Sequence, residues 1–435
     1  MRSETYTYFY KLIESMPVVS SHEHLFPDEF HTGLTLERLL ENSYIGTIAS
    51  SSGKTSLYPR DFLAASRGKS RGYSIPIDDP DRRGEFLEKC RYNSYFVWLE
   101  KSLQRIYHFD EHLTPANWDQ ISRLMAQKHA TGQVHLDILR EVAGYRHVVL
   151  DPFWDYGSDL GHPEFFSATM RTDMFVTSFH PEAPDHDGNT PFRTYPEAPT
   201  GNFDDYLDFI EDLFTRWHTA GAVAMKSASA YDRSLQYGES DRKAAADVFG
   251  RHPSKVSPDK RIAYEDFMFN WFCGLCAKFD VPFQIHTGLG KLAGSRPLFL
   301  EPVILRYPQI HFVLFHAGYP WYDEMAGLLH NHGNVTVDMV WVPIISTTGA
   351  VSALHEFIEV AHSGDLIGWG GDAFTSEESF GALLAWRYVL ARVLSEKVDD
   401  GYLDLAEAEK LAHKLTYANV AKRYKLGGLE KPITK

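Results

Sequence analysis

Residues 281–316 read VPFQIHTGLGKLAGSRPLFLEPVILRYPQIHFVLFH, with a short apolar run, VPFQIHT or IHFVLFH, at each end. Both runs carry a histidine at or next to their last residue, and a longer segment separates them. Similar runs recur along the chain and give eight predicted strands: VVSSH (18–22), HVVLD (147–151), DMFVTSF (173–179), AVAMKSA (222–228), VPFQIHT (281–287), IHFVLFH (310–316), NVTVDMV (334–340) and LIGWGGD (366–372). A helix or a long loop is expected after each strand.

This alternation of strands and helices predicts an α/β fold with a parallel sheet covered by helices, and eight strands match a (β/α)8 TIM barrel. Helical candidates occupy residues 203–220, 264–280, 321–332, 352–363 and 380–396. An open, doubly wound sheet is the structural alternative. That fold would place a ligand at a single switch point of the sheet.

Residues 27–130 differ from the rest, because turn-rich segments are mixed with helical ones between the first and second strands. We expect a mostly helical insertion that forms a cap over the barrel mouth, a subunit contact or both. The periodicity of the last segment predicts C-terminal helices at residues 400–435 that pack on the barrel. Residues 1–435 are therefore expected to form one barrel with one insertion.

Acidic residues outnumber basic ones by 58 to 43, and the formal net charge is −15 over 435 residues. This balance argues against nucleic acids and anionic membranes as partners, since phosphates favour Lys and Arg. The sequence has no signal-peptide pattern, no apolar run of about 18 residues and too few cysteines for a disulfide framework. We expect a cytoplasmic homo-oligomer that acts on a small molecule and binds neither nucleic acid nor membrane.

Ionisable side chains gather at the C-terminal ends of the predicted strands. His22 and His24 point to the same side of an extended strand, because they are two residues apart. The ends of four later strands carry Lys226, His286, His316 and Asp372. In a (β/α)8 barrel these ends face one mouth, where active sites form.

Imidazole and carboxylate groups suit a divalent metal, for which zinc is expected ahead of manganese, iron or nickel. Three histidines and an aspartate can hold one ion and leave room for a water, whose pKa the metal lowers. Asp372 is placed to bind the metal, to accept a proton from that water, or both. A His-x-His pair is a weak signal in a chain with 21 histidines, so the prediction depends on the joint pattern across the strands.

The motifs SHEHL, AMKSASAYDR, QIHTGLG, FVLFHAGYPWYDE, NVTVDM and GWGGDAF resemble the strand motifs of the amidohydrolase superfamily, which are metal-dependent hydrolases built on a (β/α)8 barrel. They are similar in particular to the Amidohydrolase 2 branch and to the amidohydrolase-like domain fused to glutamine synthetase. The insertion after the first strand is similar to that of the uronate isomerases.

The resemblance implies a role for each residue of the pattern. His22, His24 and His286 would bind the metal, and His316 would be a further ligand or would donate a hydrogen bond to substrate. Asp372 would be a ligand and the general base. Histidines at both His286 and His316 depart from typical uronate isomerases, which puts the isomerase assignment in doubt.

The resemblance allows two roles for Lys226. In binuclear members of the superfamily, a lysine on the fourth strand is carboxylated and bridges two metals. Here the motif continues SASAYDR, as in the relatives linked to glutamine synthetase. A free ammonium that binds a substrate carboxylate is therefore the rival reading, and one ion is expected rather than two.

Other side chains are predicted to face the same mouth from loops and strand ends: Trp154, Asp155, Arg171, Tyr231, Arg233 and Tyr319. Arg233 and Lys226 would pair with a substrate carboxylate, since a guanidinium offers a bidentate fork and an ammonium a point charge. The alternative is that these cations form structural salt bridges. Glu23, between the two histidines, is expected to face away from the metal.

The resulting functional hypothesis is a hydrolase that cleaves a C–N or C–O bond of a small, carboxylate-bearing molecule by attack of metal-activated water. Non-oxidative decarboxylation and isomerisation of a uronate are the enzymatic alternatives. A barrel that only binds a metabolite is the alternative outside enzymology.

Some patterns resemble functional sites without meeting their requirements. Ser52–Thr55 (SGKT) ends like a phosphate-binding loop but has isoleucine where that motif needs its first glycine, so a loop of the insertion is expected. Cys273 and Cys276 lie in a helical pattern without a second pair, which favours packing. Five histidines in loops or at helix ends are predicted to lie on the surface: His180, His186, His252, His330 and His332.

Overall fold

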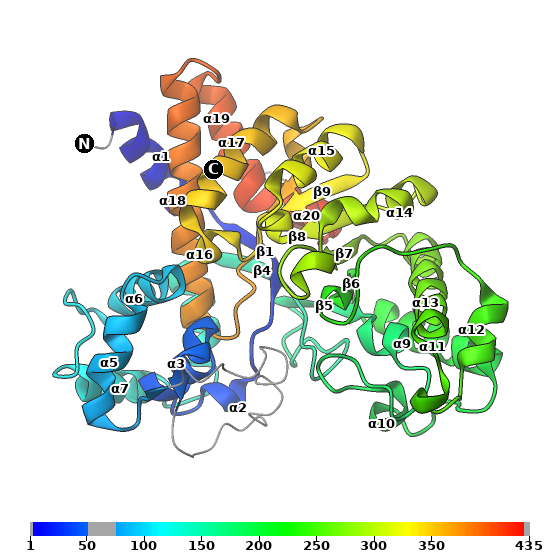
Figure 1. Cartoon of the computed structure of the whole chain (residues 1–435). Helices are drawn as coiled ribbons and strands as arrows, with labels where there is room; N and C mark the ends of the chain where they lie inside the picture. The colour runs from blue at the N-terminus through cyan, green and yellow to red at the C-terminus, as the bar shows by residue number, and fades with distance from the viewer. Residues whose placement is uncertain (1–2, 51–74, 430–435) are drawn as a thin grey trace. The chain divides into compact units, whose positions relative to one another are not determined.

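The computed structural model describes residues 3–50 and 75–429 (Figure 1). The predicted loop at Ser52–Thr55 lies outside these residues. The chain divides into two compact units, and each is described by itself. Unit 1 comprises Met1–Leu150, Met339–His355 and Trp369–Val420, and unit 2 comprises Asp151–Asp338, Glu356–Gly368 and Ala421–Lys435.

Eight strands form one sheet, in the order β1-β4-β5-β6-β7-β8-β9-β10. Their bounds are β1 Val18–Glu23, β4 Tyr145–Leu150, β5 Phe166–Arg171, β6 Ala224–Ser227, β7 Phe283–His286, β8 Phe312–Phe315, β9 Val335–Asp338 and β10 Ile367–Gly368. The strands follow one another without the reversal of order that defines a doubly wound sheet. The predicted (β/α)8 barrel class is thereby confirmed, and the open-sheet alternative is excluded.

The chain that follows β10 runs beside β1. The backbone N–H of Ser21 donates to the carbonyl of Trp369 at 3.0 Å, and that of His24 donates to the carbonyl of Ala373 at 2.9 Å. On its other side β1 pairs in parallel with β4, with Val18 opposite Tyr145. The first strand therefore has backbone partners on both sides, as a barrel strand requires.

The predicted third strand, at residues 173–179, is wrong. Asp173–Thr177 forms the short helix α9, and the third strand of the sheet is β5, which ends at Arg171. All five residues of α9 are buried. A short, fully buried apolar run has no periodicity that separates a strand from a helix, so the pattern could not decide between them.

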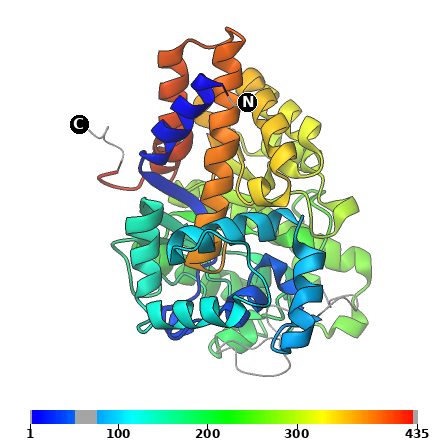
Figure 2. The same ribbon diagram turned by 90° about the vertical axis from the view of Figure 1, so that its left-hand side faces the viewer.

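The helices of unit 1 include those of the insertion. They are α1 Glu4–Glu14, α2 Asp28–His31, α3 Leu36–Glu41, α5 Pro80–Cys90, α6 Ser94–Tyr107, α7 Trp118–Lys128, α8 Val134–Asp137, α16 Val342–Ile345, α18 Ser376–Asp399 and α19 Leu405–His413. A two-stranded sheet, β2 (Ala49–Ser50) with β3 (Ile75–Pro76), also belongs to the insertion. The long helix α18 packs against α1 and α6 (Figures 1 and 2).

The helices of unit 2 are α9, α10 Pro191–Thr194, α11 Phe203–Thr219, α12 Arg242–Val248, α13 Pro258–Phe279, α14 Glu301–Arg306 and α15 Tyr322–Asn331. Two further helices cross a boundary between the units: α17 Thr347–Val360 and α20 Asn419–Arg423. Asn202 caps α11 by accepting from the N–H of Asp204, and Ser257 caps α13.

Cys273 and Cys276 are free and buried on α13, in agreement with a packing role. Within the described residues, no helix has the length and apolar character that crossing a bilayer requires.

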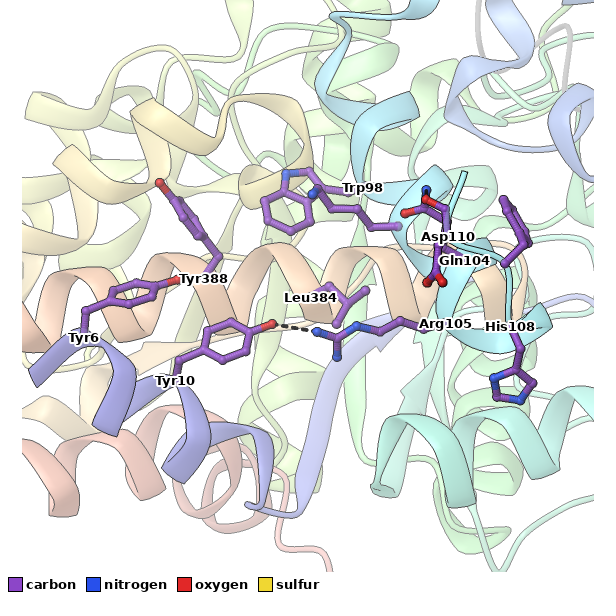
Figure 3. Close-up of a pocket in the computed structure, with 11 residues that line it drawn as sticks. Tyr6, Tyr10, Trp98, Gln104, Arg105, His108, Asp110, Leu384 and Tyr388 are labelled. Carbon is purple, nitrogen blue, oxygen red and sulfur yellow. Dashed lines mark hydrogen bonds between the residues drawn. The ribbon is translucent and has the colours of Figure 1, made fainter. Parts of the chain in front are cut away.

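Helices α1, α6 and α18 line a groove of about 770 Å³ in unit 1 (Figure 3). Its walls combine aromatic with charged and polar side chains, and Trp98 of α6 and Tyr388 of α18 have ring centroids 5.8 Å apart. Arg105 donates to the hydroxyl of Tyr10 at 3.1 Å and so joins α6 to α1. These contacts connect helix α6 of the insertion to α1 and α18.

Three buried histidines stack within unit 1. The rings of His31 and His135 are parallel to within 2°, with centroids 4.0 Å apart, and His129 lies 6.0 Å from His31 on centroids. His135 pairs with Asp28 at 2.9 Å and His129 with Glu377 at 2.6 Å. The central ring, His31, instead contacts the backbone carbonyl of Phe26 at 3.2 Å.

Burial lowers the pKa of His31 well below its usual 6.5, and the neighbouring His135 and His129 lower it further. The unfolded chain takes up a proton at this residue below pH 6.5 while the folded protein does not. Stability is therefore fully present above pH 6.5 and is lost as the pH falls below it.

We expect the free energy of unfolding to fall between pH 7.5 and 5.5, with His31 contributing at most about 1.4 kcal/mol per pH unit. The variant His31→Phe keeps a stacked ring without a titrating group, so its decline should be shallower. Urea denaturation at three pH values measures the slopes. The exposed His330, changed to Phe, serves as control and should retain the wild-type slope; an unchanged slope in His31→Phe would contradict the assignment.

Candidate metal centre

His22 of β1, His24 just after the strand and Asp372 beyond β10 form the candidate metal centre in unit 1. The Nε2 atoms of His22 and His24 lie 3.3 Å apart, and Oδ1 of Asp372 lies 3.3 Å from the first and 3.4 Å from the second. The side chain of His22 is fully buried, while His24 and Asp372 expose 12% and 7% of theirs. The three predicted unit 1 residues are therefore brought together.

The triangle of ligand atoms has the size that a tetrahedral zinc ion requires. Bonds of about 2.0–2.1 Å at tetrahedral angles place ligand atoms about 3.3 Å apart. Two imidazole nitrogens and a carboxylate oxygen are also a donor set that zinc and neighbouring transition metals accept. The residues present thus fit a single divalent ion, with a fourth position left for another ligand.

Asp372 sits on a tightly held turn beside β1. Its φ of 62° is in the left-handed region, which few residues other than glycine adopt. Its N–H donates to the carbonyl of His22 at 3.0 Å, and a Cβ added at Gly370 would lie 2.6 Å from the backbone nitrogen of His22. The two glycines that precede Asp372, Gly370 and Gly371, allow the turn to approach the strand this closely.

Tyr44, from the insertion, contacts the other oxygen of Asp372. Its hydroxyl lies 2.6 Å from Oδ2 and 2.6 Å from the backbone carbonyl of Asp372. Burial raises the pKa of Tyr44 well above its usual range, and the charge of Asp372 raises it further, so the phenol is protonated and donates. Asp372 therefore presents Oδ1 to the imidazoles while the insertion holds Oδ2.

The backbone of Tyr44 is fixed in turn by α18 and by aromatic neighbours. Its N–H donates to Oε1 of Glu378 at 2.6 Å. Its ring stacks on Trp341 and Tyr95, with centroid distances of 4.7 and 5.2 Å. Sequence reasoning missed Tyr44, since nothing in residues 44–47 marks a contact to a side chain 328 positions later.

Unit 2 contains a second histidine pair. His286 ends β7 and His316 follows β8; Nε2 of His316 lies 2.9 Å from Nδ1 of His286. The Nε2 atom of His286 is buried, and no described residue hydrogen-bonds to it. Burial lowers the pKa of His286 well below its usual range, as do the nearby His316 and Lys226. A neutral imidazole with an unused buried nitrogen is the form that binds metals or accepts a proton.

Lys226 lies on β6 in unit 2 and is almost fully buried. Its Nζ is 3.9 Å from the ring centroid of Phe315. A cation over an aromatic face is attracted by the ring, so this position suits an ammonium group.

The two predicted arginines are engaged by protein acceptors within unit 2. Arg171 donates to Asp173 at 2.8 Å, to Asp151 at 2.9 Å and to Asp187 at 3.2 Å. This is the arrangement expected of a structural salt-bridge network.

Arg233 is held in the same way by α13, where it pairs with Asp266 at 2.7 Å and with Glu265 at 3.3 Å. Its remaining N–H groups donate to the carbonyls of Ser234, Gln236 and Ile262.

His186 was expected on the surface, and this prediction is wrong. The side chain exposes only 10%, and its Nδ1 lies 2.7 Å from Oδ2 of Asp232. Burial lowers the pKa of His186, but Asp187 and Asp232 outweigh it and raise the pKa to about 9. His332 is likewise only 11% exposed and pairs with Glu301.

The remaining candidates are aromatic. The Tyr231 ring packs between two imidazoles, with centroids 4.6 Å from His286 and 5.0 Å from His186. Trp154 and Tyr319 are half-buried in the loops after β4 and β8. Asp155, next to Trp154, is exposed. Tyr231 is therefore the aromatic candidate that touches a predicted ligand within its own unit.

The barrel and the His–His–Asp group are typical of metal-dependent barrel enzymes. The chain belongs to the amidohydrolase family, whose sequence model matches residues 134–414. The resemblance found in the strand motifs is thus confirmed.

A curated relative is protein fluG of Emericella nidulans, which is 32% identical over 151 residues. The match covers 33% of this chain and 17% of fluG, so the matched region is a small part of that protein.

Three solved structures share the fold over almost their whole length. A uronate isomerase from Thermotoga maritima has a TM-score of 0.72 at 17% identity and covers 98% of both chains. A glucuronate isomerase from Caulobacter crescentus has a TM-score of 0.71 at 18% identity, covering 99% of this chain and 96% of its own. A protein from Lactobacillus casei ATCC 334, described as a proposed metal-dependent hydrolase, has a TM-score of 0.68 at 16% identity, covering 98% and 99%. At these identities the likeness shows the fold alone.

Replacing Tyr44 with Phe should lower the free energy of unfolding of the metal-free protein by about 1.5–3 kcal/mol, because a hydrogen bond to a buried carboxylate is lost. The same change should weaken zinc binding, since Oδ2 of Asp372 is no longer held. Denaturation in EDTA and zinc titration measure the two effects. Tyr107→Phe is the matched control: it also removes a 2.6 Å bond to a buried carboxylate, that of Glu377. Equal zinc affinity in both variants would contradict the role given to Tyr44.

Proposed function

We propose that this protein is a metal-dependent hydrolase that cleaves a C–N or C–O bond of a small, carboxylate-bearing molecule. The observation that carries the proposal is the triangle of His22 Nε2, His24 Nε2 and Asp372 Oδ1, with sides of 3.3–3.4 Å. Membership of the amidohydrolase family supports the same chemistry.

His22, His24 and Asp372 would hold the ion, for which zinc is the expected metal and one ion the expected number. When bound, the metal lowers the pKa of a water and polarises a carbonyl. Asp372 would be the general base for that water, and the hydroxyl of Tyr44, which donates to its Oδ2, would hold the carboxylate in place. An imidazole binds a metal in its neutral form. The assignment of His286 and His316 to the same centre, as a further ligand and a substrate contact, stays a prediction.

Lys226 is proposed to bind the carboxylate of the substrate. The supporting observations are its burial, its position on β6 and the aromatic ring of Phe315, which suits the ammonium form. Arg171 and Arg233 have their donors occupied by carboxylates and carbonyls of the protein. We base the substrate class on Lys226 because it is buried at one of the strand positions predicted to face the barrel mouth.

Isomerisation of a uronate is the second candidate. The hydroxyl of Tyr44 donates to the carboxylate of Asp372 at 2.6 Å, and general acid–base catalysis of a proton shift between neighbouring carbons could use these two groups. The fold likeness to two uronate isomerases also spans the insertion, since it covers 98–99% of this chain. The presence of histidine at both His286 and His316 is the reason for placing this candidate second.

Purified protein should contain about one equivalent of transition metal, and its removal should abolish turnover, with recovery on adding Zn²⁺. His22→Ala should lose the metal, and Asp372→Asn should lower kcat by about 10²–10⁴-fold, the usual contribution of a general base. His311→Ala is the control, because His311 bonds to Thr336 at 2.7 Å and belongs to neither histidine pair. The proposal would be refuted if the wild-type protein contained no metal. It would also be refuted if His22→Ala and Asp372→Asn left metal content and turnover unchanged.

The product separates the candidate reactions. A released amine, alcohol or acid indicates hydrolysis, carbon dioxide indicates decarboxylation, and a product of unchanged mass indicates isomerisation. Mass spectrometry of reactions with amides, lactones, aromatic acids and uronates distinguishes these outcomes. Metal binding without turnover on the whole panel would favour a barrel that only binds a metabolite.

For the substrate found in this way, Lys226→Met should raise KM by about 10–100-fold for the acid, consistent with the loss of a charge-assisted hydrogen bond worth about 1.5–3 kcal/mol. The neutral amide analogue should show little change, because it has no charge for the ammonium to bind. Steady-state kinetics on both compounds give the comparison. An equal loss on acid and amide would show that Lys226 does not recognise the carboxylate.

A further inference from the structure

Glu23, the last residue of β1, lies between His22 and His24, and its carboxylate is fully buried. It accepts hydrogen bonds from the backbone N–H groups of Gly371 at 3.1 Å and Ala373 at 2.8 Å. These residues flank Asp372 on both sides. The side chain thus points away from the imidazoles, as strand alternation predicts, and reaches the turn that presents the third ligand.

The turn leaves no free space around this carboxylate. A Cβ added at Gly371 would lie 2.4 Å from one oxygen of Glu23 and 2.7 Å from the other. Two hydroxyls, of Ser20 and Ser379, also donate to the carboxylate, at 2.9 and 3.0 Å. Glu23 is therefore fixed from the strand and from α18 while it holds the turn.

Three consecutive N–H groups of the turn are bound by two consecutive residues of β1. The N–H groups of Gly371 and Ala373 donate to the side chain of Glu23, and the N–H of Asp372 donates to the carbonyl of His22. Asp372 adopts a φ of 62° that is unfavourable for a residue with a side chain, so the conformation must be imposed by its surroundings. Glu23 supplies the acceptors on both sides of that residue.

We propose that Glu23 is a positioning residue that holds Asp372 in the conformation that binds metal, so that the central residue of the His-Glu-His motif sets the affinity of the site. The inference rests on the proposed metal centre but not on the reaction that the centre performs. Glutamate suits this role because each of its two side-chain oxygens accepts a hydrogen bond from one backbone N–H of the turn. A glutamine would place an NH2 group against one of the backbone donors.

The test measures Zn²⁺ affinity of the metal-free protein by competition with a chromophoric chelator, without any substrate. Glu23→Gln should weaken zinc binding by about 10–100-fold, the usual effect of losing a group that orients a metal ligand. Gly371→Ala should have the same effect from the opposite side, because its Cβ displaces the Glu23 carboxylate. Glu23→Gln with wild-type affinity would overturn the proposal.

Glu377→Gln separates positioning from general destabilisation. Glu377 is also fully buried and accepts hydrogen bonds from His129 and Tyr107, but neither of these residues belongs to the metal centre. Both glutamine variants should lose stability in EDTA, while only Glu23→Gln should lose zinc affinity. Equal loss of affinity in both would also overturn the proposal.

Ser379→Ala decides the case if Glu23→Gln does not fold, since it removes a single hydroxyl donor to Glu23. A smaller but measurable drop in zinc affinity supports positioning, and an unchanged affinity refutes it. If the wild-type protein binds no metal, the proposed function fails. If the wild type binds metal but turns over no substrate, the measurement on Glu23 still stands.

Discussion

The backbone ladder between β1 and the residues after β10 is the contact on which the candidate centre depends. His22 and His24 lie near the start of the chain, and Asp372 follows some 350 positions later. Neither segment alone carries a complete donor set. Because Ser21 and His24 donate to carbonyls of Trp369 and Ala373, the last strand connection is aligned in register with the first strand. A slip by one residue would turn the histidines to the other face of the strand.

Buried charge is used differently in different parts of the molecule. The charges of Arg171 and Arg233 are neutralised by nearby carboxylates of the protein. These arginines therefore have a structural role. Glu377 follows the same logic: burial alone would raise its pKa, yet His129 and Tyr107 lower it to about 2. The metal centre differs, because its three donor atoms converge on one another. Convergence of like acceptors is costly unless a cation joins them.

The sequence was sufficient for features that depend on local periodicity. Alternation along β1 placed His22 and His24 on one side and Glu23 on the other, and the apolar runs located β6 to β9 within a few residues. It failed where burial removes periodicity, as in α9, and where a loop folds inward, as at His186. Tyr44 shows a further limit. Tyr44 acts on Asp372 through a contact between an irregular insertion and a turn far away in the sequence. The local pattern of a single sequence does not indicate such a contact.

The contact between Tyr44 and Asp372 also bears on how such a barrel could change its chemistry over evolutionary time. Barrel enzymes are usually thought of as a conserved scaffold on which loops are exchanged to alter substrate choice. Here the insertion supplies the phenol of Tyr44, which donates a hydrogen bond to Asp372, the proposed general base. A replacement of residues 27–130 would therefore also change the hydrogen bonding of that carboxylate. Grafting the insertion of another family member onto this chain would be an experiment on catalysis as much as on recognition.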